Sequence, residues 1–271
     1  MKRRYFLLVL ALLIVVGGCF RMRNLIRFKF MQNYRPLEVK LSPLTQMDEG
    51  AFVVYVYSIN RTWNSRLVAA CNKLFYDEIT VFKIPVAAMH FENVTEAPIG
   101  PDNRMKFDCW FNTQYFMENL QPCEGWKDNQ LLLGKPRFEN TTIAIDSNGK
   151  PEICGRCSSS SAQQLFECSH THRDGQKQTL NMDNLNYRSY LAISKDYVYY
   201  AVGNNNSLIS CRDADELMKF HGISQWIITD GGTSIDYFFR GKNNIYQFSS
   251  VPLRSLLSGW TSPYYMAAVN R

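Results

Sequence analysis

A basic cluster followed by an apolar run at the N-terminus sets the first constraint on this chain of 271 residues. Lys2, Arg3 and Arg4 precede an apolar stretch over residues 5–20, and residues 21–30 contain four further basic side chains. A charged segment before an apolar one is typical of membrane insertion and export. The apolar run is just short of a bilayer span, which takes roughly 17–25 residues. We therefore predict that residues 1–30 form a signal anchor with a basic juxtamembrane segment, in a helix that makes no contact with the globular body.

Cleavage of this segment is the alternative. Gly17 and Gly18 are small residues of the kind that precede cleavage sites, but a basic run directly after Cys19 is unusual there and favours a retained anchor. The orientation stays open, because basic residues flank both ends of the apolar run. The expected location is extracytoplasmic, either membrane-anchored or secreted, in the lumen of the secretory pathway, at the cell surface or in a virion envelope.

Composition indicates a globular, β-rich body. Hydrophobic residues make up 46% of the chain and charged residues 20%, which excludes a disordered protein, and the 14% of aromatic residues favours sheet packing. The net charge of +6 is modest, and four of the basic side chains lie beside the apolar run. Nucleic-acid binding requires Lys and Arg clustered on one face, so no nucleic-acid partner is expected. No cofactor is expected either.

The patterning predicts an α+β fold, a single β-rich domain of mixed sheet with two or three helices over residues 45–271, behind the N-terminal transmembrane or signal helix. Strands are indicated at 51–59 and 78–89, and Asn148-Gly149 marks a hairpin within 141–154. Other elements are a hairpin over 190–202, an irregular insertion over 98–137, strands on both sides of Arg240-Gly241 and a final strand near 266–269.

Two segments between these strands have helical patterns. Leu67, Cys71, Leu74 and Phe75 recur at helical spacing, which predicts a helix in which Cys71 faces the core. The segment 212–222 predicts a short helix with Asp213 and Glu216 as its capping box and Gly222 as its end.

Cysteines and glycosylation sequons fit an exported protein. Seven cysteines follow Cys19, and we predict at least two intramolecular disulfides among them, with Cys109–Cys123 as the local pair. Four sequons begin at Asn60, Asn93, Asn140 and Asn205. The segment 154–172 contains Cys154, Cys157, Cys168, His170 and His172, which leaves a zinc site open as an alternative. A loop closed by a disulfide is the interpretation we favour for an exported chain, and no metal is predicted.

The stretch QWIITDGGTSIDYFF, residues 225–239, separates two apolar runs by an acid and two glycines. Backbone N–H groups of Gly231 and Gly232 can approach an anion closely, because no Cβ stands in the way. An ordinary turn in which Asp230 hydrogen-bonds its own backbone is the structural alternative. Asp236 falls in alternation with Ser234, and an exposed carboxylate is the usual case for such a strand residue.

The order of elements around this stretch resembles the phosphodiester glycosidase family. Arg188 opens a strand, a hairpin and a helix ending in Gly222 follow, and an apolar strand leads to Asp230-Gly231-Gly232-Thr233-Ser234. The segment 87–100, which contains His90, occupies the place of the family's Asn-Gly-x-Phe segment. The resemblance covers about residues 45–271, and its specific part is 188–241.

This resemblance implies the hydrolysis of a sugar-1-phosphodiester. Asp230 and His90 would be catalytic, and the phosphate of a glycosyl phosphodiester or phosphorylated glycan would be held by Arg188, Gly231, Gly232, Thr233 and Ser234. The leaving group is a stable phosphomonoester anion, so strong general-acid help is less necessary than in ordinary glycoside hydrolysis.

The sequence also departs from the family pattern. Thr233 replaces the third glycine, and Met89-His90-Phe91 lacks the family's Asn and Gly. A side chain where backbone approaches phosphate narrows the cradle. The alternative is therefore a lapsed member of the family that acts as a binding or structural membrane glycoprotein.

Overall fold

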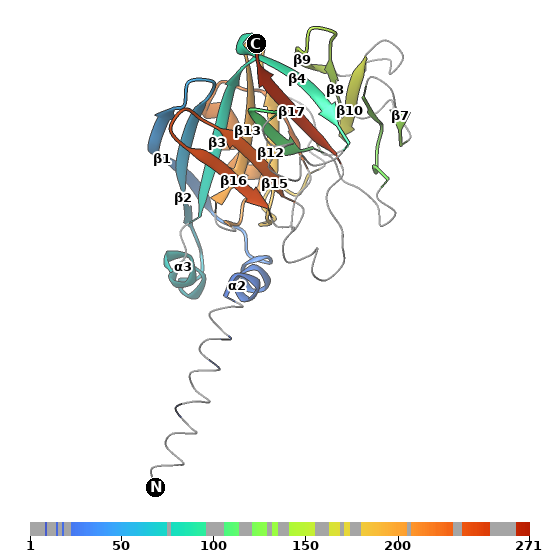
Figure 1. Ribbon diagram of the computed structural model, residues 1–271. Coiled ribbons are helices and arrows are strands. Elements are labelled where there is room, and N and C mark those ends of the chain that lie inside the picture. The colour runs from blue at the N-terminus through green and yellow to red at the C-terminus, as the bar shows by residue number, and fades with distance from the viewer. Residues whose placement is uncertain are drawn as a thin grey trace.

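The computed structural model describes residues 23–74, 77–95, 106–113, 121–128, 132–134, 141–154, 163–168, 171–173, 180–204, 207–229, 235–249 and 264–271, with the single positions 9, 15 and 18. Within these ranges the chain forms three sheets and three α-helices, with the two helices α2 and α3 at one end of the sheets (Figure 1). The helices are α2 (Arg23–Met31), α3 (Arg66–Lys73) and α5 (Cys211–Phe220), and a short 3-10 helix, η1, covers Val86–Ala88.

The largest sheet has seven strands in the order β1-β2-β3-β13-β12-β14-β11. Its members are β1 (Glu38–Asp48), β2 (Val53–Thr62), β3 (Glu78–Pro85), β11 (Thr171–Arg173), β12 (Ser189–Ile193), β13 (Tyr197–Gly203) and β14 (Gln225–Ile228). Two smaller sheets have five strands each. The second sheet, in the order β16-β15-β5-β17-β4, contains β4 (Met89–Val94), β5 (Cys109–Asn112), β15 (Asp236–Arg240), β16 (Ile245–Ser249) and β17 (Tyr265–Asn270). The third, in the order β7-β6-β10-β8-β9, contains β6 (Trp126–Lys127), β7 (Leu132–Leu133), β8 (Thr141–Ile145), β9 (Pro151–Cys154) and β10 (Gln164–Cys168).

The seven-stranded sheet buries side chains on both faces. One face packs against the other two sheets in an aromatic core, in which the rings of Phe82 and Phe239 stack with centroids 3.7 Å apart. The opposite face is covered by α5, whose Leu217 and Met218 pack on strand residues such as Tyr190. Strands that are covered on both sides have continuous apolar sequences, as in YVYYAVG of β13.

The local sequence signals for the hairpins are confirmed. β8 pairs with β9 around Gly149, whose φ of +69° suits glycine, and β12 pairs with β13. The α+β, β-rich body with three helices is also confirmed among the described residues. Every described strand pairing is antiparallel, so the sheets are antiparallel rather than mixed.

Helix ends and faces differ in part from the predictions. α5 has its capping box one turn earlier than expected, with Ser210 as N-cap and Asp213 as the reciprocal partner. Gly222 follows the helix with a φ of +72°, as predicted. In α3 the buried side chain is Val68, whereas Cys71, which was predicted to face the core, is only partly buried, and Leu67 and Leu74 are exposed.

The cysteine prediction also requires correction. Cys71, Cys109, Cys123, Cys168 and Cys211 are reduced thiols, which leaves two of the seven downstream cysteines, too few for two disulfides among them. Cys109 is buried in β5 and Cys123 is exposed, so the predicted Cys109–Cys123 disulfide is absent.

α2 is docked on the body, contrary to the prediction of a helix without contacts. Met31 is buried beside Val68 of α3 and Leu208, and the ring of Phe28 stacks on Tyr187 with centroids 5.8 Å apart. These contacts attach α2 directly to the domain. No helix within the described residues is long and apolar enough to cross a membrane, and most of residues 1–22 lies outside them.

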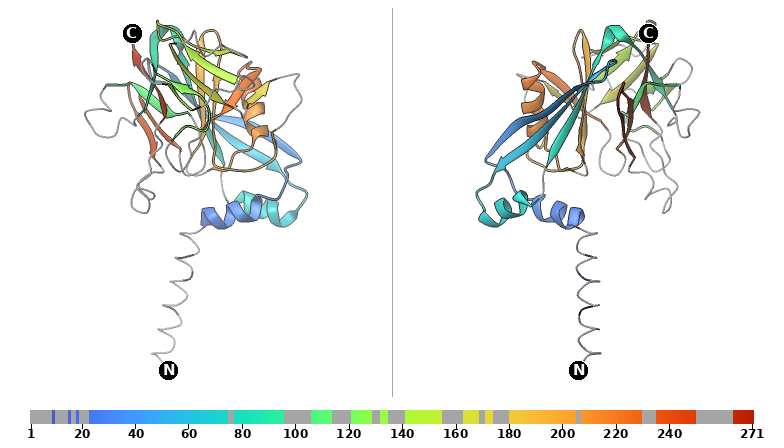
Figure 2. Two further views of the ribbon diagram at one scale, coloured as in Figure 1. Left: turned by 90° about the vertical axis from the view of Figure 1, so that its right-hand side faces the viewer. Right: turned by 60° about the vertical axis from the view of Figure 1, so that its left-hand side comes forward.

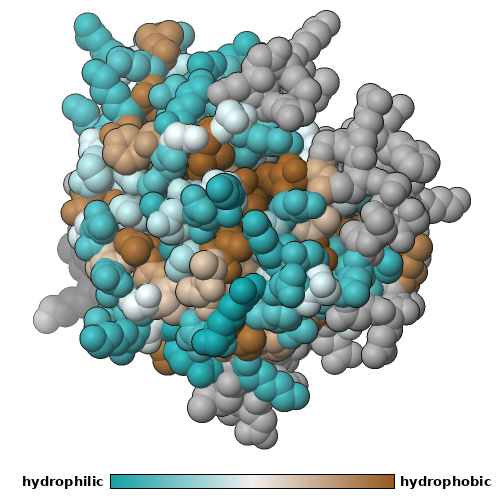
Figure 3. Space-filling view, turned by 90° about the horizontal axis from the view of Figure 1, so that it is seen from above, coloured by the Kyte–Doolittle hydropathy of each residue, from teal (hydrophilic) through white to brown (hydrophobic). Residues whose placement is uncertain are grey.

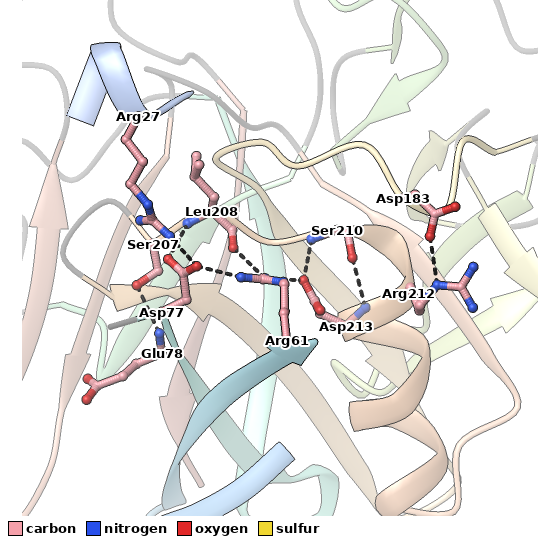
Figure 4. Close-up of polar contacts among 10 residues, drawn as sticks. All are labelled: Arg27, Arg61, Asp77, Glu78, Asp183, Ser207, Leu208, Ser210, Arg212 and Asp213. Atoms are coloured by element: carbon pink, nitrogen blue, oxygen red, sulfur yellow. Dashed lines mark hydrogen bonds and ion pairs between the residues drawn. The ribbon is translucent and has the colours of Figure 1, made fainter. Parts of the chain in front are cut away.

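A buried ion network fastens α2 (Figure 4). Arg27 of α2 and Arg61 of β2 both donate to Oδ2 of Asp77, and Arg61 also donates to Asp213 at 2.6 Å and to the carbonyl of Leu208 at 2.8 Å. Burial alone would lower the pKa of Arg61, but the two carboxylates outweigh this and raise it. Two cations and two anions are therefore buried together, and we call these four charged residues the base network.

Candidate functional site

The start of β12, at Ser189, lies beside Thr229, the last described residue before the predicted anion-binding stretch. β12 pairs with β14, with Tyr190 opposite Ile228, and the N–H of Thr229 donates to the carbonyl of Ser189 at 3.1 Å. The hydroxyls of Ser189 and Thr229 are buried and lie 2.6 Å apart. Arg188 directly precedes β12, and the paired strand β14 leads through Thr229 to residues 230–234. Arg188 therefore lies beside the end of β14 at which that stretch begins.

Arg188 faces α5. Its Nη1 donates to Sγ of Cys211, the first residue of that helix, at 2.9 Å. Burial raises the pKa of the Cys211 thiol, and the Arg188 charge acts in the opposite direction. The raised pKa favours the protonated thiol, whose sulfur accepts one N–H of the guanidinium.

A second group of polar side chains lies at the other end of the stretch 230–234, in the second sheet. The N–H of Asp236 donates to Oδ1 of Asn112 at 3.0 Å, and the hydroxyl of Tyr265 donates to Asp236 at 2.9 Å. Asp236 is only 4% exposed, so the expectation of an exposed strand carboxylate was wrong. Its strand, β15, lies between β16 and β5 rather than at a sheet edge.

Two side chains in this region carry a buried polar atom whose hydrogen-bonding capacity is unused among the described residues. Nδ2 of Asn112 and Oγ1 of Thr113 have no hydrogen-bond partner in the part of the chain that the structure describes. Such atoms cost roughly 1–3 kcal/mol each when left unsatisfied, so they are candidates for ligand contacts. We use the name strand-end cluster for five buried polar residues at strand ends of two sheets: Ser189 and Thr229 in the seven-stranded sheet, and Asn112, Thr113 and Asp236 in the second sheet, where Asn112 and Asp236 alternate with the core residues Phe111 and Tyr237.

The sequence alone did not single out most of this cluster. Asn112 and Thr113 lie in the stretch interpreted as an irregular insertion, and their one signal is a polar pair directly after the apolar run CWF. Asp230, Gly231, Gly232, Thr233 and Ser234 lie outside the described residues, so their roles stay predictions.

His90 belongs to the opposite end of the sheets from Arg188. Its Nδ1 lies 3.1 Å from the carbonyl oxygen of Asn148 in the β8–β9 turn. The neighbouring η1 residue Val86 donates to Asp196 in the β12–β13 turn, at the far end of β12. At about 3.3 Å per residue, the five steps from Arg188 to Ile193 cover about 16 Å. The structure therefore does not bring His90 together with Arg188.

A cleft of about 410 Å³ opens near the His90 end. It lies between the β8–β9 hairpin, the β12–β13 turn and the segment after α5, and its polar lining includes Lys150, Glu152, Lys195 and Gln225. The cleft is thus separate from the strand-end cluster, and it contains none of the residues predicted to bind phosphate.

Two of the four sequon asparagines lie in the described residues. Asn60 is exposed in β2. Asn93 is 4% exposed in β4, and its Nδ2 donates to the carbonyl of Lys127 at 3.0 Å, so a glycan there would displace this contact. Asn140 and Asn205 lie outside the described residues.

The cysteine and histidine segment is divided between two sheets. Cys154 is in a disulfide, as the favoured interpretation predicted, and therefore cannot act as a thiolate ligand. Cys168 ends β10 in the third sheet, whereas His172 lies in β11 of the seven-stranded sheet and pairs with Asp215 at 3.0 Å. Cys168 and His172 therefore do not lie on one strand, as a shared zinc site in this segment would favour. Cys157 and His170 lie outside the described residues, and no group that could hold a metal ion occurs among the described ones.

The fold has counterparts among proteins of known structure, although no protein family and no curated protein matches the sequence. A hypothetical protein from Synechocystis aligns at a TM-score of 0.51 and 10% identity, over 86% of this chain and 68% of that one. This likeness shows the fold alone.

Two further structures are similar at a lower score. The zebrafish N-acetylglucosamine-1-phosphodiester alpha-N-acetylglucosaminidase catalytic domain, auto-inhibited by its pro-peptide, has a TM-score of 0.46 and 14% identity, over 86% of this chain and 83% of that one. A putative exported protein from Burkholderia pseudomallei K96243 has a TM-score of 0.46 and 8% identity, over 88% and 98%.

Proposed function

We propose that this protein is a membrane-anchored, extracytoplasmic glycosidase that hydrolyses a sugar-1-phosphodiester at the junction of β12, β14 and β15. Asp230 stabilises or attacks the anomeric carbon, and the amides of Gly231 and Gly232 with Thr233, Ser234 and Arg188 hold the phosphate. Residues 1–30 supply the anchor, and residues 45–271 form the catalytic domain.

The observation that carries this proposal is the pairing of β12 with β14. An arginine at the start of one strand stands beside the end of the neighbouring strand, from which an Asp-Gly-Gly sequence continues. Guanidinium and backbone amides together suit a phosphodiester anion. Nδ2 of Asn112 and Oγ1 of Thr113, which are buried and have no partner among the described residues, are neutral groups that suit sugar hydroxyls.

A specificity panel tests the proposal. The purified full-length chain is incubated with sugar-1-phosphodiesters and with the corresponding neutral glycosides, and release of the phosphomonoester is measured. We expect hydrolysis of a phosphodiester and none of the neutral glycoside. Asp230→Asn keeps the shape but removes the charge, so it should lower kcat about 10²–10³-fold or more. Asp196→Asn, in the exposed β12–β13 turn, is the matched control and should leave kcat unchanged.

Arg188→Ala should mainly raise KM, because the phosphate is present in the ground state as well as in the transition state. Arg212→Ala is its control, since Arg212 lies one residue past Cys211 but pairs with Asp183 at the surface. If the wild type and Asp230→Asn are equally inactive across the panel, the proposal that this protein is an enzyme is contradicted.

A binding protein without catalysis is the second candidate, and the position of His90 favours it. The second residue that the resemblance implies as catalytic lies at the other end of the sheet from Arg188. Under this alternative the wild type would bind a sugar phosphodiester, lose affinity on Arg188→Ala, and release no product.

A further inference from the structure

We propose that the outward faces of α2 and α3 form a surface that lies against an anionic lipid bilayer. This base surface consists of Ile26, Lys29, Arg66, Leu67, Lys73 and Leu74. The proposal rests on the anchor proposed above but not on the catalytic activity.

The helices α2 and α3 pack together as one unit. Met31 of α2 and Val68 of α3 are buried in the same small apolar cluster, together with Trp63, Leu185 and Leu208. Figures 1 and 2 show the two helices side by side at one end of the sheets in every view. Arg27 locks α2 into this position through Asp77, so both helices present fixed outward faces.

Helix geometry determines which side chains point outward. At 100° per residue, Ile26 and Lys29 lie on the side of α2 away from the buried Arg27 and Met31. In α3 the same spacing places Arg66, Leu67 and Lys73 away from Val68, and Leu74 continues this face at the C-cap. The exposed fractions are large for apolar residues, 50% for Ile26, 63% for Leu67 and 76% for Leu74.

The charge of this surface is of one sign. Neither RNLIRFKFM of α2 nor RLVAACNK of α3 contains an acidic residue. Asp77 neutralises Arg27 in the interior, whereas Lys29, Arg66 and Lys73 are exposed. Exposed apolar side chains among basic ones are typical of helices that lie in a membrane interface.

The short connection to the apolar residues 5–20 is the reason for proposing a lipid bilayer as the partner of the base surface. Two residues, Arg21 and Met22, separate the apolar run from the start of α2. At no more than about 3.6 Å per residue, α2 begins within about 11 Å of the end of that run. If residues 5–20 lie in lipid, the base surface meets the headgroups.

The test measures lysine accessibility in the full-length chain. The protein is reconstituted in zwitterionic vesicles and in vesicles with added anionic phospholipid, and the acetylation rates of Lys29 and Lys73 are followed by mass spectrometry. Lys242 is the internal reference, because its N–H donates to Glu49 at the opposite end of β1 and β2. That end, seen in Figure 3, mixes hydrophilic residues with small hydrophobic areas. We expect several-fold slower acetylation of Lys29 and Lys73, but not of Lys242, on the anionic vesicles.

A pair of variants separates the surface from the anchor. Leu67→Glu with Leu74→Glu should restore rapid acetylation, while the control Ile245→Glu, at an equally exposed apolar residue of β16, should not. A chain that floats with vesicles but shows no protection overturns the proposal and leaves the anchor intact. A chain that does not float overturns both, whatever its hydrolytic activity. Protection that appears in detergent and grows with protein concentration indicates a second copy instead and also overturns the proposal.

Discussion

The base network and the strand-end cluster are both buried and polar, yet they differ in how their groups are satisfied. In the base network Arg27 and Arg61 meet Asp77 and Asp213, so each buried charge has an opposite partner. In the strand-end cluster the groups are mostly neutral, and two polar atoms have no partner in the described part of the chain. Paired charges fix a geometry, whereas unpaired donors are left for a ligand. The first cluster is therefore structural and the second is the better candidate for function.

Removing one charge from the base network should cause the largest loss of stability. Asp77→Asn leaves Arg27 and Arg61 buried without their shared carboxylate, which should lower the free energy of unfolding by about 3–5 kcal/mol. The control is Glu38→Gln, because Glu38 pairs with Lys40 on the open surface, where an ion pair contributes about 0–1 kcal/mol. Urea unfolding monitored by tryptophan fluorescence measures both variants. Equal small effects would show that the base network does not hold the fold together.

This contrast also explains what the sequence could predict. The hairpin at Asn148-Gly149 was predictable because its signal is local. Arg61 and Asp213 are 152 residues apart in the chain, and no local pattern joins them. Arg27 was assigned to the basic juxtamembrane segment for the same reason, since Asp77 lies 50 residues away.

The burial of the candidate site could not be predicted from the sequence either. Alternation in the sequence predicted the strand of Asp236, but only the sheet order shows that this strand has neighbours on both sides. The strand β1 was missed altogether, because Pro43 interrupts it at a register shift. The predicted stretch 230–234 follows the buried polar Thr229 and precedes Ile235 and the buried Asp236, which is as far as the structure takes that prediction.

Acid should lower the stability of the fold through His221 and Glu49. The fold keeps His221 neutral and Glu49 charged, so the two groups compare a buried neutral group with a hydrogen-bonded charge. Burial, with a smaller effect of the Lys83 charge, lowers the pKa of His221 from 6.5 to about 4. The Asn244 side chain first, then the Tyr246 hydroxyl and the Asn243 N–H, lower the pKa of Glu49 from 4.5 to about 2. Both folded-state pKa values lie below the unfolded ones, so both contributions are present at neutral pH and are lost on acidification.

The two windows are separable by mutation. Stability should fall between pH 6.5 and 4 through His221 and between pH 4.5 and 2 through Glu49. His221→Gln should flatten the upper window, because glutamine does not titrate and can still hydrogen-bond to the Tyr57 hydroxyl, and Glu49→Gln should flatten the lower one. Urea midpoints measured across this pH range test both. An unchanged upper slope in His221→Gln would assign that window to other groups.

The smallest effect on stability is expected for a substitution of Thr113. The comparison of the two clusters predicts that this substitution leaves stability unchanged or raises it, whereas Asp77→Asn lowers it. Oγ1 of Thr113 is buried and has no partner within the described residues, so Thr113→Val replaces an unsatisfied hydroxyl by a methyl group of the same shape. The free energy of unfolding should stay the same or rise by about 0–1 kcal/mol. Thr80→Val is the control, because its hydroxyl donates to Asn204 and its loss should cost about 1 kcal/mol. If the hydroxyl of Thr113 serves a ligand, Thr113→Val should in addition raise KM for a sugar phosphodiester, or its Kd in a protein that only binds. A clear loss of stability in Thr113→Val would show that this hydroxyl is part of the fold and remove it from the candidate site.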